Sequence, residues 1–480
     1  MACRLISAPL FFFVFIYIKD FIMSDVIKIK KGLDLPISGV AEQKTSEALD
    51  IRRYAVKPTD FVGLMPRLLV QEGDEVQAGS PLFCEKKDTR IVFTSPVAGK
   101  VAAVVRGEKR ALLAVVVETA DAELHTMKVE SQMTDAESIK KVMLETGLWT
   151  ALRQRPFGTV ASPDAKPKNI FVSAFDSAPL AADMDYCLKG READFAKGIE
   201  LLSKLTGGKL HVSFRQGQKL ESAVAEKGNV VKHIVAGPHP AGLIGTQIAA
   251  IEPINKGDVV WTMNAQDVAV LGHIANAGEY KPERVIAVAG PQVKNAQYYH
   301  VMAGAQVSGI IAGLKMEENP EGNGFRYISG NVLSGVQIAA DSYIGAYDSL
   351  LTVLPEGDHY DFMGWLFPKR GRFSFSRTFL SGFTAKCSKK CGKSTFDTNL
   401  HGGVRPFIFT GAFEQVFPMD IYPLHLIKAC IVGDIELMEN LGIYEVEPED
   451  FALCEFVDVS KTEIQTIVRQ ALEQLRKEAM

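Results

Sequence analysis

Apolar runs of strand length alternate with a helical pattern between residues 126 and 270. Four runs that predict buried strands occupy residues 170–175, 210–214, 232–236 and 259–262. Between the first two runs, Phe195, Ile199 and Leu202 share one face of a helix that we expect to end at Gly207. Because strands that alternate with helices form parallel sheets, the pattern predicts a Rossmann-like α/β domain over residues 126–270.

Short β-rich runs separated by turn residues characterise residues 23–125. The stretch VQEGDEVQAGSPLFCEKKDTRIVFTSPVAGKVAAVV at 70–105 contains V-x-x-G-D-x-V, G-x-x-L and S-P-x-x-G-x-V in that order. This order resembles the biotinyl/lipoyl-like barrel-sandwich fold, whose carrier members present one modified lysine on a tight turn. Here Lys86 and Lys87 lie at that turn without the residues that flank modified lysines. We therefore expect a structural barrel rather than a carrier of biotin or lipoate.

A third predicted domain covers residues 271–365. Residues 283–313 have the pattern of a strand, a Gly-Pro turn, a second strand, a Gly-Ala turn and a short helix. Residues 326–336 predict a returning strand. This order resembles the soluble-ligand-binding β-grasp fold, which in many proteins makes protein contacts and does not require a ligand.

Helix signals dominate the last predicted domain, residues 366–480. Asp434 is expected to cap a helix over residues 435–441, and Ser460 with Glu463 matches a capping box in front of the final helix. An apolar stripe of period 3.6 follows that box at Ile464, Ile467, Val468, Ala471, Leu472 and Leu475. We expect this stripe to pack in the helical domain itself rather than against a partner.

Composition agrees with several globular domains and excludes some partners. The chain has 480 residues, which allows three or four domains, and its composition of 47% apolar and 23% charged residues excludes disorder and fibrous structures. It carries 53 Lys and Arg against 57 Asp and Glu, so no strongly basic field exists to attract nucleic acid. After residue 22 no run of about 18 apolar residues appears that would cross a bilayer.

The first 22 residues differ from the rest of the chain. Residues 10–18 (LFFFVFIYI) are apolar, but residues 19–22 offer no small residues for signal cleavage, and nine residues are too few for a membrane anchor. Met23 is followed by Ser, Asp and an alternating apolar and polar run. We therefore expect Met23 to be the natural start and residues 1–22 to be a spurious extension.

The seven cysteines show no disulfide framework, because their number is odd and their spacing is scattered. Only Cys387 and Cys391 lie close together in the sequence. A zinc or iron–sulfur site needs about four ligands, and the neighbouring His401 and Cys430 follow no known ligand spacing. We predict no metal site and a reducing compartment.

One glycine-rich turn follows a predicted strand at the position where α/β proteins bind phosphate. A phosphate cradle needs backbone N–H groups, yet Pro238 and Pro240 have none, and the spacing is not G-x-G-x-x-G. We therefore favour a structural or partner-docking turn over a nucleotide site. The candidate residues of this turn are Gly237, Pro238, His239, Pro240 and Gly242.

Long stretches of the chain resemble the NqrA family, one of the component families of the sodium-translocating NADH:quinone reductases. The matching stretches are IKIKKGLDLPISG (27–39), TGLWTALRQRPF (146–157), GPHPAGLIGT (237–246), VAGPQV (288–293), ISGNVLSG (328–335), FEQVFPMDIYP (413–423), GDIELMENLG (433–442) and EPEDFALCEFV (447–457). The resemblance extends from Val26 to beyond Val457 and leaves residues 1–22 outside, which agrees with a start at Met23.

The resemblance implies a peripheral protein on the cytoplasmic face of the bacterial inner membrane. It implies a complex of six components that oxidises NADH, reduces ubiquinone to ubiquinol and exports Na⁺. It also implies that the partners are the other five components, designated B to F, especially the integral membrane component B. In this family NADH, FMN, FAD, riboflavin, an iron–sulfur centre and the sodium path belong to those other components. The family is related in fold to the NADH-binding flavoprotein of respiratory complex I and to the C component of the Rnf complex.

Two features of those relatives are missing from this sequence. The chain has G-P-H-P-A-G instead of a flavin-binding G-R-G-G-x-G-F loop, and it has no C-x-x-C-x-x-C cluster. We therefore expect a protein that works by binding and holds no redox cofactor of its own, so no catalytic residue is assigned. The alternatives are a flavin- or NADH-binding dehydrogenase in its own right and a carrier domain fused to an enzyme.

Ubiquinone is the ligand that the resemblance suggests. A quinone ring needs a flat apolar contact and hydrogen-bond donors for its two carbonyl oxygens. Residues 147–157 supply aromatic and arginine side chains, and residues 54–65 of the barrel supply further aromatics. The candidate contacts are Trp149, Arg153, Arg155, Phe157, Tyr54, Phe61 and Met65. The alternative is that these residues pack between domains, with the arginines held by local carboxylates.

Overall fold

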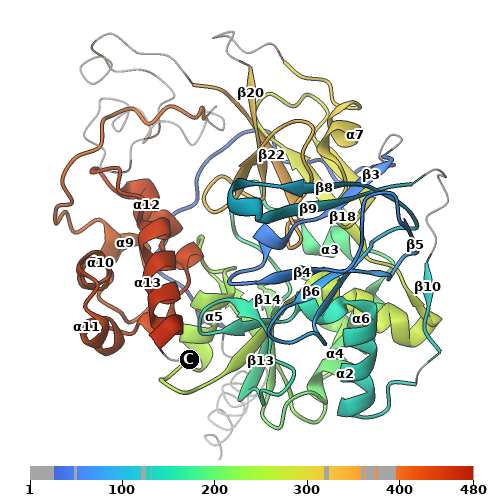
Figure 1. Ribbon diagram of the computed structural model, residues 1–480. Helices are drawn as coiled ribbons and strands as arrows, with labels where there is room; N and C mark the ends of the chain where they lie inside the picture. Colours follow the sequence, from blue (N-terminus) through green and yellow to red (C-terminus); the bar gives the residue numbers. More distant parts are fainter. Residues whose placement is uncertain are drawn as a thin grey trace, which may run out of the picture.

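The computed structural model describes residues 26–47, 51–119, 126–130, 132–317, 324–357, 363, 373, 375 and 396–478. The predicted extension 1–22 and the pair Cys387 and Cys391 lie outside these residues. The described residues form a multidomain protein of mixed α/β class, in which four groups of elements surround a common centre (Figure 1).

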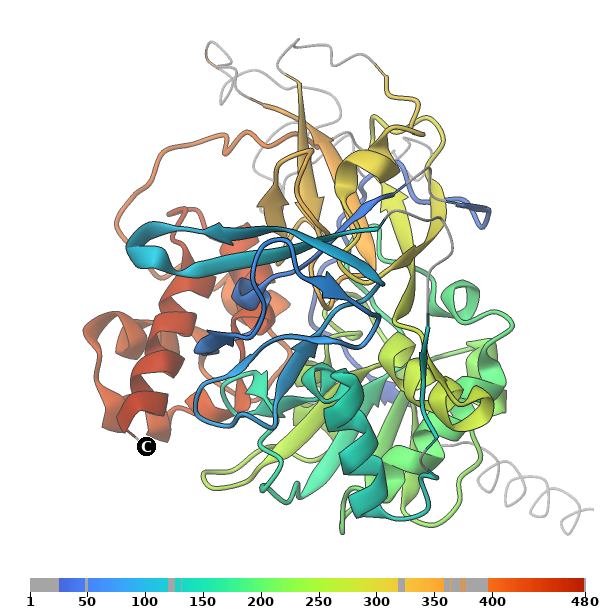
Figure 2. The same cartoon turned by 45° about the vertical axis from the view of Figure 1, so that its right-hand side comes forward.

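Two small antiparallel sheets form the N-terminal group. One has the order β3-β9-β8-β5 and the other β4-β6-β7. Their strands are β3 (Arg53–Val56), β4 (Pro66–Leu68), β5 (Glu75–Val76), β6 (Pro81–Glu85), β7 (Val92–Thr94), β8 (Gly99–Arg106) and β9 (Leu112–Glu118). Phe83 and Phe93 stack with ring centroids 4.7 Å apart, and both belong to the main hydrophobic core. Figure 2 shows this barrel in front of the other groups.

A seven-stranded sheet of order β1-β15-β14-β13-β16-β11-β12 forms the second group. Its strands are β1 (Ile27–Lys28), β11 (Arg153–Arg155), β12 (Thr159–Val160), β13 (Asn169–Ser173), β14 (Leu210–Arg215), β15 (Val230–Ala236) and β16 (Val260–Asn264). The strands from β1 to β16 are parallel, whereas β11 and β12 are antiparallel. The four strands predicted from apolar runs are confirmed at β13 to β16.

Helices cover this sheet. They are α2 (Ala136–Thr146), α3 (Met184–Cys187), α4 (Glu192–Ser203), α5 (Ile244–Ile251) and α6 (Ala265–Ala277), with the short pair β10 (Met127–Lys128) and β17 (Glu279–Tyr280) at the edge. The predicted helix face of Phe195, Ile199 and Leu202 is buried in α4, although that helix ends at Ser203, before Gly207. Helices α4 and α6 touch at Gly198 and Gly272, where an added Cβ would collide with the backbone of the other helix.

The order of the parallel strands reverses between β13 and β16. From β13 the chain passes to β14 and β15 on one side, and then returns to β16 on the other side. Ser173 and Asn264 are aligned at the carboxyl ends of these two strands. A crevice outside the carboxyl ends of such a pair is the usual ligand position in open α/β sheets.

A six-stranded sheet of order β2-β19-β18-β22-β20-β21 forms the third group. It contains β2 (Thr45–Glu47), β18 (Glu283–Ala289), β19 (Gln297–Met302), β20 (Phe325–Ser329), β21 (Val336–Ile338) and β22 (Leu350–Pro355), with α7 (Val307–Ile311) beside it. The prediction of one returning strand over 326–336 is wrong. Gly330 adopts a φ of 93° and begins a turn, so the segment forms the two antiparallel strands β20 and β21.

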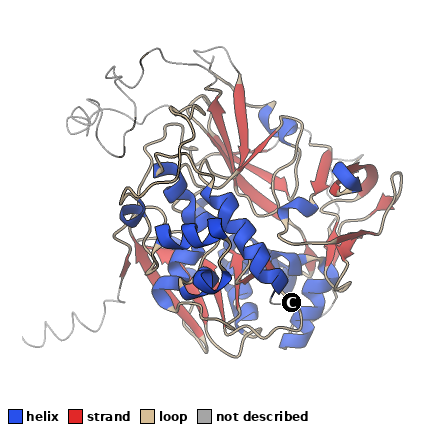
Figure 3. Ribbon diagram, turned by 60° about the vertical axis from the view of Figure 1, so that its left-hand side comes forward, coloured by secondary structure: helices blue, strands red, loops and turns tan. Residues whose placement is uncertain are grey.

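The C-terminal group is helical, and we call it the C-terminal module (residues 396–478). Its helices are α9 (Phe413–Val416), α10 (Pro423–Val432), α11 (Ile435–Asn440), α12 (Ala452–Val457) and α13 (Ile464–Glu478), which gather on one side of the molecule (Figure 3). The α13 stripe packs inside this module, and all its residues except the half-buried Ile467 are buried. Among the described residues no helix has the length and apolarity needed to cross a membrane.

Of the two caps predicted in this module, one is confirmed. The Asp434 carboxylate accepts a hydrogen bond from the Leu437 N–H at the start of α11. The Ser460 capping box is wrong, because α13 begins only at Ile464 and the Ser460 hydroxyl donates to the Pro406 carbonyl. The backbone N–H groups of Ser460 and Thr462 donate to the Asp458 carboxylate, which holds the segment before α13 in a turn.

Candidate functional site

A cavity of about 400 Å³ lies at the carboxyl ends of β13 and β16. Its wall comes from all four groups of elements, and the polar residues that represent them are Asp60, Arg153, Ser173, Asn264, Asp348 and Glu449. The volume falls within the range of roughly 300–1,000 Å³ that is typical of ligand pockets. We call this space the central cavity and treat it as the candidate functional site.

Arg153 is the cationic side chain of the central cavity that has no ion pair within the described residues. It lies on β11 opposite Thr262 of β16, and its guanidinium carbon lies 5.0 Å from the centroid of the Tyr347 ring. Tyr347 is fixed by its hydroxyl, which donates to the Thr150 carbonyl at 2.8 Å. Burial raises the pKa of Tyr347, so the ring remains a neutral phenol. Arg153 therefore presents free N–H donors beside a fixed aromatic face.

A buried cluster of charges joins the sheet to the C-terminal module. The side chain of Arg155 is 4% exposed, and its guanidinium contacts Glu449 at 2.9 Å and Asp450 at 3.3 Å. Arg469 of α13 contacts Glu447 at 2.7 Å. The side chains of Arg155, Glu447 and Asp450 are buried, whereas those of Glu449 and Arg469 are each 27% exposed. We call these five residues the buried charge cluster.

Burial changes the protonation of this cluster. It raises the pKa of Asp450 to about 6, although the charge of Arg155 opposes the shift. Burial also raises the pKa of Glu447. For Glu449 burial acts in the same direction, but the charges of Arg153 and Arg155 outweigh it and hold the pKa below its usual value. At neutral pH the cluster therefore contains buried carboxylates that depend on the arginines for compensation.

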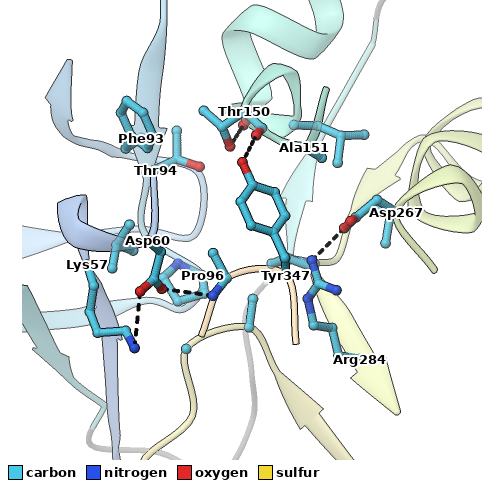
Figure 4. A pocket seen from close by; sticks show the side chains of 18 of the residues that line it. Lys57, Asp60, Phe93, Thr94, Pro96, Thr150, Ala151, Asp267, Arg284 and Tyr347 are labelled. Carbon is cyan, nitrogen blue, oxygen red and sulfur yellow. Dashed lines mark hydrogen bonds and ion pairs between the residues drawn. The ribbon is translucent and has the colours of Figure 1, made fainter. Parts of the chain in front are cut away.

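A second cavity of about 90 Å³ adjoins the first and shares Asp60, Arg284 and Tyr347 with it (Figure 4). Lys57 contacts the Asp60 carboxylate at 3.3 Å, and Arg284 contacts Asp267 at 2.7 Å. Burial raises the pKa of Asp60. With its charges paired and its volume well below roughly 300 Å³, this cavity is too small for a ring-sized ligand in the observed conformation.

Comparison with known proteins places the chain in one family. The model of the NqrA N-terminal barrel-sandwich hybrid domain matches residues 27–120, that of the NqrA second alpha/beta domain 134–280, and that of the NQRA C-terminal domain 285–340. The protein of this type in the Na(+)-translocating NADH-quinone reductase of Yersinia pseudotuberculosis serotype O:1b (strain IP 31758) is 38% identical over 460 residues, covering 94% of this chain and 100% of that protein. Its counterpart from Neisseria meningitidis serogroup B (strain ATCC BAA-335 / MC58) is 39% identical with the same coverage. The chain belongs to the NqrA family.

The match to the barrel-sandwich model confirms the fold predicted for the first group. Among solved structures, an NAD⁺-reducing [NiFe]-hydrogenase in the H₂-reduced state aligns over 72% of this chain and 61% of its own chain. Its TM-score of 0.37 and identity of 12% are too low to establish a common fold.

The quinone candidates do not form one site in this member of the NqrA family. Arg153 and Arg155 line the central cavity, and Phe61 lines the smaller one. Trp149 is fully buried, and its indole N–H donates to the Ala161 carbonyl at 2.8 Å. Phe157 packs edge-on against Tyr444 with ring centroids 6.2 Å apart.

The two remaining candidates lie elsewhere on the barrel. Tyr54 is 4% exposed in β3, where it pairs with Val117 of β9. Met65 is 45% exposed on the barrel surface. Neither residue lines the central cavity.

The glycine-rich turn makes its contacts within the chain. His239 is 2% exposed, and its ring Nδ1 lies 3.0 Å from the Ser177 hydroxyl. The backbone N–H of His239 donates to the Asp34 carboxylate at 2.8 Å. Burial lowers the pKa of His239 to about 4, so the imidazole is neutral. In the same turn Pro240 and Gly242 are buried, Pro238 is half-buried and Gly237 is exposed.

Sequence reasoning missed the residues that face the two arginines. Glu447, Glu449 and Asp450 come from the segment E-P-E-D, which lies about 300 positions after Arg155. Three acids within four residues beside apolar neighbours are a signal for buried ion pairs, but the sequence does not say where their partners lie. The alternative that carboxylates hold the arginines applies to Arg155, although these carboxylates are remote in sequence.

Proposed function

We propose that the chain is the cytoplasmic, peripheral NqrA component of a Na⁺-translocating NADH:ubiquinone reductase of the bacterial inner membrane. The complex would oxidise NADH, reduce ubiquinone to ubiquinol and export Na⁺. The observation that carries the proposal is 38–39% identity to NqrA proteins of such reductases over 94% of this chain and their whole length. The proposed partners are components B to F of the complex, with the integral membrane component B serving to anchor the chain.

The chain's own task in this proposal is binding and assembly. The NADH, flavins and iron–sulfur centre would lie on other components, and the seven-stranded and six-stranded sheets would serve as Rossmann-like and β-grasp scaffolds. The central cavity supports a binding role because it is large enough for a ring and is bordered by groups from four parts of the chain.

Ubiquinone is the ligand that we propose for the central cavity. Arg153 would donate to a carbonyl oxygen of the quinone ring, since its N–H groups have no acceptor within the described residues. The Tyr347 ring and the apolar side chains of Val62, Phe175 and Met184 would provide the flat contact. A neutral head group suits this space because the neighbouring carboxylates already balance the other arginines.

Quinone titration of an Arg153 variant tests the ligand. We expect Arg153→Gln to weaken binding of short-chain ubiquinone about tenfold, because a hydrogen bond from a charged donor is lost. Arg67→Gln is the control, since Arg67 is exposed on the barrel and lines neither cavity. Unchanged affinity in Arg153→Gln would exclude this quinone position.

Affinity purification from native membranes tests the assembly. The tagged chain should bring integral membrane proteins of the complex with it, and variants that lack the C-terminal module should lose them. Recovery of the chain alone would contradict the proposal. A visible flavin spectrum in the purified chain would favour the alternative of a flavin- or NADH-binding dehydrogenase.

A further inference from the structure

Helix α5 begins where a phosphate group would bind in a nucleotide-binding α/β protein. It follows β15 at the carboxyl edge of the parallel sheet, and no side chain in the described part of the chain caps its first turn. The free N–H groups and the dipole of such a terminus favour a negative charge. The Thr246 hydroxyl in this turn is also buried and has no hydrogen-bond partner within the described residues.

An acid from the C-terminal module already lies at this terminus. A Cβ atom on Gly245, the second residue of α5, would collide with Oδ1 of Asp450 and lie 2.6 Å from its Oδ2. Asp450 is 4% exposed, and its Oδ2 accepts from Arg155 and from the Glu447 N–H. Its Oδ1 has no hydrogen-bond partner in the described part of the chain. This unpartnered oxygen is therefore turned toward the first turn of α5.

Near the α5 terminus the carboxyl groups at least match the arginines in number. The buried charge cluster holds two arginines and three carboxylates, and Arg153 is near enough to Glu449 to influence its ionisation. The buried carboxyl group of Asp176 lines the same cavity. A phosphate beside Asp450 would add buried negative charge without a partner, whereas removal of Asp450 would lower that cost.

We propose that Asp450 is a built-in anion that lies where a phosphate would bind at the α5 N-terminus and keeps phosphate-bearing ligands away from that terminus. Asp450 does not itself line the central cavity, but Leu243 and Ile244 of the same terminus do, so Asp450 would be a specificity-determining residue at the border of the cavity. The inference deepens the proposed function by naming a class of ligand that this border excludes, and it does not require that quinone binds there. Gly245 belongs to the same device, since a larger residue would displace the carboxylate.

Phosphate binding to Asp450 variants of the full-length chain tests this inference. Asp450→Ala vacates the position, and Asp450→Asn keeps the volume but removes the charge. We expect both variants to bind inorganic phosphate at least tenfold more tightly than the wild-type chain in equilibrium dialysis. The controls are Asp434→Ala and Asp434→Asn, which remove a carboxylate from the exposed N-terminus of α11 in the same module.

Formate provides a second measurement that reports on folding. A small carboxylate should replace the missing side chain, so formate should raise the melting temperature of Asp450→Ala more than chloride does at equal ionic strength. If Asp450→Ala does not fold, its refolding yield in formate and the phosphate affinity of Asp450→Asn give the answer.

The proposal is overturned if neither Asp450 variant gains phosphate affinity over the Asp434 controls and formate raises neither the melting temperature nor the refolding yield of Asp450→Ala. These measurements are independent of the quinone titration. Failure of Arg153→Gln to weaken quinone binding would refute the proposed ligand, yet it would leave the phosphate result unaffected.

Discussion

Replacement of Arg155 by Met is expected to destabilise the protein by about 3–5 kcal/mol. Met retains most of the side-chain volume but removes the charge that faces Glu449 and Asp450. Asp450 cannot be rehydrated in place, because its side chain is 1% exposed. The value is the usual cost of breaking a buried ion pair from one side, which leaves an uncompensated charge.

The chain offers an exposed counterpart as the control. Arg90 contacts Asp88 at 2.7 Å and Asp164 at 2.6 Å, so it also joins two carboxylates, but its side chain is 49% exposed. Arg90→Met should cost less than about 1 kcal/mol, because water solvates the released acids. The two variants therefore lose the same number of ion pairs, but the arginine that is replaced is buried in one and exposed in the other.

Urea unfolding, followed by far-UV circular dichroism and tryptophan fluorescence, measures both variants. The double variant with Arg155→Met and Asp450→Asn should recover part of the loss, since it removes one of the uncompensated carboxylates. The loss in Arg155→Met should also be smaller at pH 5 than at pH 8, because Asp450 is then protonated. Equal losses in Arg155→Met and Arg90→Met would refute the argument from burial.

Three further variants test the same structure. Trp149→Phe should lose about 1–3 kcal/mol in urea unfolding, because the buried Ala161 carbonyl loses its donor. Gly245→Ala should lose a similar amount by displacing Asp450, and its melting temperature should fall below that of wild type. In Asp450→Asn one pH-dependent contribution disappears. The pKa of Asp450 rises from 3.8 to about 6 on folding. Asp450 therefore contributes up to about 3 kcal/mol to the free energy of unfolding below pH 3.8, and this contribution is lost as the pH rises through 6. A pH series of unfolding curves should show that the contribution is absent from Asp450→Asn.

Individual helices and strands of this protein could be predicted from the sequence because buried apolar residues recur with the period of each element. The apolar run at 170–175 gave β13, and the stripe from Ile464 to Leu475 gave the buried face of α13. Caps were less predictable. Ser460 and Glu463 have the spacing of a capping box, but the Asp458 carboxylate competes for the backbone N–H groups of that turn.

The pairing of strands that are far apart in the chain left no comparable signal in the sequence. Ile27 lies beside Val235 in a parallel pair, so the N-terminal segment adds a strand to a sheet whose other strands follow more than 120 residues later. Likewise, β2 joins β19 in the six-stranded sheet. A two- or three-residue strand has too short a pattern to predict its partner or its register.

Some residues of the candidate site could also be predicted from the sequence, and others could not. Arg153 and Arg155 could be selected from the sequence because two arginines beside aromatics suggest recognition chemistry, and both line the central cavity. The same reasoning favours Trp149, yet its indole is buried and hydrogen-bonded within the fold. The aromatic and charged side chains of one short segment point in different directions, and sequence spacing alone cannot separate them.

The central cavity and the buried charge cluster are physically coupled. Glu449 lines the cavity and also pairs with Arg155, and Arg469 lines it while pairing with Glu447. Part of the cavity wall therefore exists only while the C-terminal module is docked on the sheet. Because buried ion pairs tolerate few geometries, they fix the docked position more narrowly than apolar packing would. A ligand that contacts this wall must then stabilise the docked module, so binding and assembly cannot be independent properties of this protein.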